Sequence, residues 1–119
     1  MKTNGLTVEA ADGLHHDDWC WAETRLTLVA ERDASELRVN VWFKPEDQGP
    51  QRALMTVGSD KSPPIVEFAD LGQPKEFVLP VTWRKGEVMS VRLATPHRPT
   101  VSPEEKRNIA FSLMSLSAT

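Results

Sequence analysis

Strict alternation of apolar and polar side chains is the feature that most constrains how this chain can fold. From Leu37 to Phe43 every second residue is aliphatic or phenylalanine, and the residues between them are Arg38, Asn40 and Trp42. Successive side chains of a β-strand point to opposite faces, so this pattern predicts a strand with one buried face and one polar face that carries a tryptophan. The segment Thr24–Ala30 alternates in the same way.

Similar short segments follow one another along the chain and are separated by turn residues, with nine prolines and six glycines in the whole sequence. We therefore predict about eight short strands and little helix. The predicted strands are Leu6–Glu9, Thr24–Ala30, Leu37–Phe43, Ala53–Val57, Ile65–Phe68, Phe77–Val81, Val88–Ala94 and Ile109–Leu116.

The connections between these segments carry their own signals. The polar stretch Lys44–Arg52 is typical of a long surface loop. The turn Arg84–Gly86 is expected to join Phe77–Val81 and Val88–Ala94 in a long hairpin, because glycine tolerates a positive φ. One short helical turn is expected at Ser102–Arg107, since serine can cap a helix and proline suits its first position.

The fold class follows from how this many strands can bury their apolar faces. A chain of 119 residues has room for one hydrophobic core, so we predict a single domain over residues 1–119. A single open sheet would leave its apolar face in water. The prediction is an all-β fold with two antiparallel sheets packed face to face, as in a β-sandwich or jelly roll.

Charge and cysteine content exclude several classes of protein. Fourteen Lys and Arg against seventeen Asp and Glu give a net charge of -3, which disfavours binding to nucleic acid. No apolar run approaches the roughly 20 residues of a membrane-spanning helix. With one cysteine, Cys20, and a start that lacks the apolar core of a signal peptide, we predict a cytoplasmic protein without membrane insertion.

Two stretches of the chain look familiar. The opening stretch Gly13–Trp21 contains Gly-Leu, two aspartates and Trp-Cys-Trp, and the closing stretch Pro99–Leu116 contains a proline, an acidic residue, an arginine and then Ile-Ala-Phe-Ser-Leu. Together they resemble a family of small β-sandwich modules found at the C-terminal end of bacterial glycosyltransferases and other envelope-polysaccharide proteins. The chain departs from that family at Ala110, where glycine is usual, and at Asn108, near a second basic position. The resemblance implies a carbohydrate-binding-module-like accessory domain, whose partner is a glycan, a polysaccharide or a glycosyltransferase domain.

A candidate ligand site follows from the tryptophans. Indole rings stack on the apolar C–H faces of sugars, and hydrogen-bonding side chains beside the ring fix the sugar hydroxyls. Trp42 is the leading candidate, because alternation places it on one face with Arg38 and Asn40. Trp19 and Asp18 are the further candidate ligand residues.

Each tryptophan also has a purely structural interpretation. A second layer, or the loop Lys44–Arg52, could cover Trp42. Trp21 is expected in the core, and Trp83 is expected to pack over one end of the fold. The exposure of Trp42 therefore discriminates a sugar-binding module from a structural domain.

Catalysis and metal binding have weaker support. The segment His15–Cys20 holds two histidines, two aspartates and a cysteine, but it lacks the ligand spacing of a zinc site, and we predict no metal or other cofactor. A structural calcium on Asp12, Asp17 and Asp18 is the alternative, since carboxylate oxygens suit that ion. Because no nucleophile motif or phosphate-binding loop is present, we predict that the chain is not an enzyme.

The leading hypothesis is thus a non-catalytic carbohydrate-binding or glycosyltransferase-associated accessory module. The alternative is a structural domain that docks a protein through an exposed sheet face or edge and has no glycan ligand.

Overall fold

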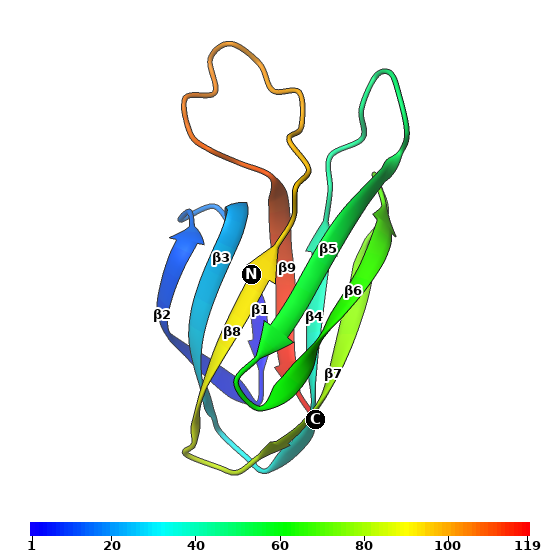
Figure 1. The fold of residues 1–119 in the computed structure, drawn as a ribbon. Helices are drawn as coiled ribbons and strands as arrows, with labels where there is room; N and C mark the ends of the chain where they lie inside the picture. Colours follow the sequence, from blue (N-terminus) through cyan, green and yellow to red (C-terminus); the bar gives the residue numbers. More distant parts are fainter.

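The computed structural model describes residues 1–119 and contains nine β-strands and no helix (Figure 1). The all-β prediction is confirmed. The strands are β1 (Lys2–Asn4), β2 (Leu6–Leu14), β3 (Trp19–Ala30), β4 (Ala34–Trp42), β5 (Arg52–Ser59), β6 (Ser62–Asp70), β7 (Lys75–Trp83), β8 (Val88–Ala94) and β9 (Phe111–Ala118).

The strands form one continuous sheet that curls into a nearly closed barrel. The order is β6-β5-β8-β3-β9-β4-β7, with β2 paired to β3 and β1 paired to β9. Only β1 and β9 run parallel; the other paired strands are antiparallel. The end strands β6 and β7 lie beside each other, and the ion pair between Glu67 and Lys75 (3.0 Å) spans the open seam.

The expected division into two separate sheets is not confirmed. Strand β3 pairs with β8 over Glu23–Val29, and then with β9 at Trp19 and Cys20. Because β3 forms hydrogen bonds with both β8 and β9, the hydrogen-bonded network passes from one side of the barrel to the other without a break. The ninth strand, β1, was not predicted, since its three residues depend on a long-range pairing with β9.

The core fills the inside of this barrel. All the inward residues predicted for Leu37–Phe43 are fully buried, which confirms the orientation of β4. The ring of Phe43 lies 5.7 Å from that of Phe111. Trp83 packs in the core at one end and donates from Nε1 to the carbonyl oxygen of Glu87 (2.8 Å), so its predicted packing role is confirmed.

The predicted hairpin of Phe77–Val81 and Val88–Ala94 is wrong, although its turn is present. The N–H of Glu87 donates to the carbonyl of Arg84 (2.9 Å), and Gly86 takes a φ of 85°. However, β7 pairs with β4, whereas β8 pairs with β3 and β5. The turn residues determine only the local reversal of the chain, whereas the partners of β7 and β8 are strands on opposite sides of the barrel (Figure 1).

The helical turn predicted at Ser102–Arg107 is absent, and the segment forms a single turn. The N–H of Glu105 donates to the carbonyl of Ser102 (3.0 Å), and no helix follows. Helix nucleation is unfavourable unless further bonds or packing follow. Here Arg107 instead binds Glu105 and Asp17, which ties the segment to the β2–β3 connection.

Candidate functional site

The residues predicted to bind a ligand gather on one side of the barrel, around β4, β9 and the start of β3. We call this surface the tryptophan face and define it as Asp18, Trp19, Arg38, Asn40 and Trp42. All five residues are half-buried, so that part of each lies at the surface. The sequence pattern had placed three of them on one strand face, and the sheet register adds the other two.

Two indole rings form the centre of the tryptophan face. The ring centres of Trp19 and Trp42 lie 6.1 Å apart, and the rings meet edge to face at 65°. Both residues are in register with Ser112 of β9, the strand between them. Because serine is small, the two larger side chains can meet above it. Trp42 thus packs against Trp19 and is half-buried.

Arg38 is held by two acidic neighbours. Its guanidinium lies 2.7 Å from a carboxylate oxygen of Glu76 and 2.7 Å from one of Glu36. These hydrogen bonds, Glu76 first, raise the pKa of Arg38 above its ordinary value. The side chain is 40% exposed, so its position is fixed while part of it remains open to solvent.

Asn40 has an unsatisfied polar atom beside a hollow. Its Oδ1 is buried and has no hydrogen-bond partner. The side chain lines a hollow of about 450 Å³ on the outer surface, together with Met1, Lys2, Met114 and Ser115. Met114 occupies a bulge in β9, because Asn40 pairs with Ser115 while the next residue of β4 pairs with Leu113. A buried amide atom without a partner is costly and rare, which makes the Asn40 amide a candidate for hydrogen bonding to water or a ligand in the hollow.

Asp18 has a structural role, which explains why an aspartate stands directly before Trp19. It takes a φ of 71°, a left-handed conformation that aspartate tolerates better than most residues. Its N–H donates to the carbonyl of His15 (3.0 Å), and its carbonyl accepts from Leu113 (2.9 Å). Its carboxylate forms an ion pair with the amino group of Met1. This turn delivers Trp19 to the outer surface of β3.

Trp21 points outward as well, but it does not join the tryptophan face. The guanidinium of Arg98 lies 4.7 Å from its ring centre, in a cation–π contact. The ring is half-buried and packs against the core, so the expectation of a fully internal Trp21 is only partly met.

The histidine and aspartate cluster does not converge on one point. The Nε2 of His15 lies 3.0 Å from the carbonyl of Asn108, and Asp17 binds Arg107 at 2.7 Å. Burial raises the pKa of the Cys20 thiol to about 12, so it is a poor metal ligand and a poor nucleophile near neutral pH. No group of three or more His, Cys, Asp or Glu residues could hold a metal ion.

The ion pairs of Arg107 with Glu105 and Asp17 predict how the stability of the protein depends on pH. The guanidinium of Arg107 lowers the pKa of Glu105 from 4.5 to about 2 and also lowers the pKa of Asp17. Because the pKa of Glu105 is lower in the folded protein than in the unfolded chain, its ionised form stabilises the fold at any pH above about 4.5. This stabilisation is lost as the pH falls from about 4.5 towards 2. Glu105→Gln should therefore lower the melting temperature at about pH 6 and have a much smaller effect at about pH 2.

The neighbouring carboxylate provides the control for this measurement. Glu104 is exposed, and Glu104→Gln should leave the melting temperature unchanged at both pH values. Equal effects of the two substitutions at about pH 6 would contradict a specific role for Glu105.

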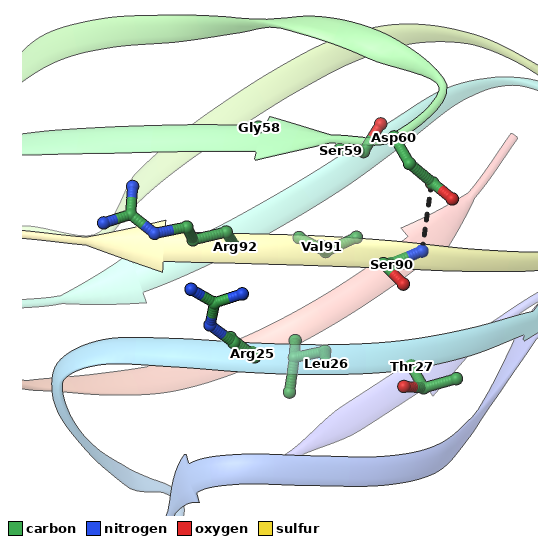
Figure 2. A pocket seen from close by; sticks show the side chains of 9 residues that line it. All are labelled: Arg25, Leu26, Thr27, Gly58, Ser59, Asp60, Ser90, Val91 and Arg92. Atoms are coloured by element: carbon green, nitrogen blue, oxygen red, sulfur yellow. Dashed lines mark hydrogen bonds between the residues drawn. The ribbon is translucent and has the colours of Figure 1, made fainter.

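A second surface was missed by the sequence analysis. We call it the arginine groove and define it by its lining, which encloses a hollow of about 350 Å³ over β3, β5 and β8 (Figure 2). Alternation places Arg25, Thr27, Ser90 and Arg92 on the outer faces of β3 and β8, with Leu26 and Val91 buried beneath them, but only the register brings the two strands together. The lining residues are Arg25, Leu26, Thr27, Gly58, Ser59, Asp60, Ser90, Val91 and Arg92.

Comparisons of this chain with protein-family models, with curated proteins and with solved structures find no match. No helix of the structure has the length and apolar character needed to cross a bilayer.

Proposed function

We propose that this protein is a non-catalytic carbohydrate-binding module that takes a glycan on the tryptophan face, as an accessory to glycan-synthesising or polysaccharide proteins. The observation that carries the proposal is the pair of half-buried indoles of Trp19 and Trp42, on the same face as the hollow that Asn40 lines. The barrel-like sheet would provide the rigid scaffold that a β-sandwich provides in such modules.

Sugar chemistry suits this arrangement. A sugar ring presents an apolar C–H face, which stacks on an indole, and a rim of hydroxyl groups, which donate hydrogen bonds. The exposed part of Trp42 would meet the apolar face. One hydroxyl would hydrogen-bond the amide of Asn40 at the hollow, and the guanidinium of Arg38, already fixed by Glu36 and Glu76, would donate to a second hydroxyl. The dissociation constant is expected on the order of micromolar to millimolar.

A binding role also agrees with the state of the reactive groups. The Cys20 thiol is buried, and burial raises its pKa to about 12, which removes the thiolate needed for attack. On the tryptophan face, the carboxylate of Asp18 is paired with an amino group. These features favour recognition over chemical catalysis.

Substitution of Trp42 tests the proposal. On an array of neutral and acidic oligosaccharides, Trp42→Ala should weaken binding at least about tenfold, because a stacking ring is lost. Asn40→Leu should also weaken binding, since it removes the acceptor. The matched control is Phe68→Ala, which removes an aromatic ring that is 67% exposed on β6, a strand separated from β4 by β7. Its affinity should equal that of the wild type.

Three outcomes would contradict the proposal. The first is a wild-type protein that binds no glycan. The second is unchanged affinity in Trp42→Ala and Asn40→Leu. The third is equal loss in Phe68→Ala. If Trp42→Ala fails to fold, Asn40→Leu alone decides.

A second candidate function is the structural interaction domain without a glycan ligand. The specific observation is β6, which ends the sheet and exposes Phe68 (67%) and Val66 (58%). A partner protein, such as a glycosyltransferase domain, would pack on these exposed apolar side chains, since β7 lies beside the free edge of β6. This candidate predicts that Phe68→Ala, rather than Trp42→Ala, abolishes partner binding in a pull-down with that protein.

A further inference from the structure

The arginine groove places two like charges opposite each other. Arg25 of β3 and Arg92 of β8 are direct partners in the sheet register, and both side chains lie on the outer surface (Figure 2). Like charges directly opposite each other destabilise a sheet. Such a pair therefore needs a compensating anion.

Within the chain, Glu23 is the carboxylate that binds both arginines. It lies 2.7 Å from Nη2 of Arg25 and 3.2 Å from Nε of Arg92. One negative charge thus faces two positive charges. Only Nε and Nη2 of each guanidinium contact Glu23, which leaves Nη1 of both arginines available to another acceptor. The two side chains are 66% and 50% exposed, so a ligand can reach them.

The other end of the groove has a different chemistry. Asp60, Ser90 and Thr27 lie there, away from the guanidinium groups (Figure 2). The Oδ1 of Asp60 accepts the N–H of Ser90 at 3.0 Å, which fixes the carboxylate at the rim. The carboxylate can accept hydrogen bonds from sugar hydroxyls, and the hydroxyl groups of Ser90 and Thr27 can both accept and donate them. The groove therefore has an anion-binding end and a hydroxyl-binding end.

We propose that the arginine groove binds an acidic sugar residue of a polysaccharide, with the sugar carboxylate on Arg25 and Arg92 and the sugar hydroxyls near Ser90 and Asp60. This second site rests on the proposed function for its glycan class and narrows that class to an acidic glycan. A nucleic acid fits less well, because Thr27, Ser90 and Asp60 at the other end of the groove offer partners for sugar hydroxyls.

Titration with an oligogalacturonate, followed by NMR chemical shifts, tests this site. The wild type should show shifts at the amides of Arg25, Ser90 and Arg92. Arg92→Gln and Arg25→Gln should each weaken binding about tenfold, because a charge-assisted hydrogen bond to carboxylate is lost. Glu23→Gln should strengthen binding several-fold, since it removes the competing carboxylate.

The matched control is Arg84→Gln, which removes the same charge from an exposed arginine in the β7–β8 turn. Its affinity for the oligogalacturonate should not change. Equal weakening in Arg84→Gln would show a general charge effect and overturn the proposal. So would equal binding of a single-stranded DNA oligomer of the same charge, or unchanged affinity in all three groove variants.

Failure of this proposal can be distinguished from failure of the proposed function by adding a neutral gluco-oligosaccharide and Trp42→Ala. Loss of neutral binding in Trp42→Ala, with acidic binding unaffected by Arg92→Gln, overturns only the groove. Acidic binding that depends on Arg92, together with neutral binding that is unaffected by Trp42→Ala, supports the groove and overturns only the tryptophan face. If neither sugar binds the wild type, both proposals are wrong.

Discussion

Replacing Phe111 with alanine is expected to lower the free energy of unfolding by about 3–5 kcal/mol. Phe111 is fully buried, its ring lies 5.7 Å from that of Phe43, and its backbone pairs with Cys20 where β3 and β9 join. Alanine would leave a cavity at the junction of the two sides of the barrel, where neighbouring strands have little freedom to collapse. Urea denaturation monitored by tryptophan fluorescence measures the loss.

The same strand supplies the control for this measurement. Met114 is 41% exposed in the β9 bulge, and Met114→Ala should cost less than about 1 kcal/mol. A cost for Phe111→Ala as small as that would contradict the inward orientation of β9.

Gly13→Ala should be strongly destabilising, because two effects act together. Gly13 has a φ of 81°, which costs a residue with a side chain roughly 1–3 kcal/mol. A Cβ at this position would also lie 2.4 Å from the backbone carbonyl oxygen of Glu23, a contact that only movement of β3 could relieve. We therefore expect a loss of stability larger than the backbone cost alone, measured by urea denaturation.

Gly86→Ala separates the two effects. Gly86 has a similar φ of 85°, but no atom lies within 4 Å of the position that a Cβ would take. Its substitution should cost only the backbone contribution. Equal costs at Gly13 and Gly86 would contradict the close approach of β2 to β3.

The glycine in the opening motif thus has a structural explanation. Gly13 lies where the β2–β3 register shifts between Asp12 and Leu14, just before the turn that ends at Asp18. Close backbone approach and the left-handed turn together place Trp19 on the surface beside Trp42. Gly13 and Asp18 belong to the stretch that resembles the opening of the β-sandwich modules, and their backbone conformations give a physical reason for a glycine and an aspartate at these positions.

Predictions from local sequence patterns were correct where neighbouring residues decide the structure, and wrong where residues far apart in the chain decide it. The orientation of β4 was correct, because alternation over Leu37–Phe43 directly reflects which face is buried. The hairpin at Arg84–Gly86 and the helical turn at Ser102–Arg107 were wrong. In the first case the turn formed, but the two strands paired with distant strands instead of each other, and in the second the distant Asp17 bound Arg107.

The sequence by itself determined the all-β class, the inward face of the main strands and the outward position of Arg38, Asn40 and Trp42. These properties depend on a two-residue period and on turn residues, both of which are local. Only the tertiary structure decided that Trp19 meets Trp42 and that Arg25 faces Arg92. It also decided that β3 joins both sides of the barrel. Strand partners and register are chosen by contacts between residues far apart in the chain, and no local pattern encodes them.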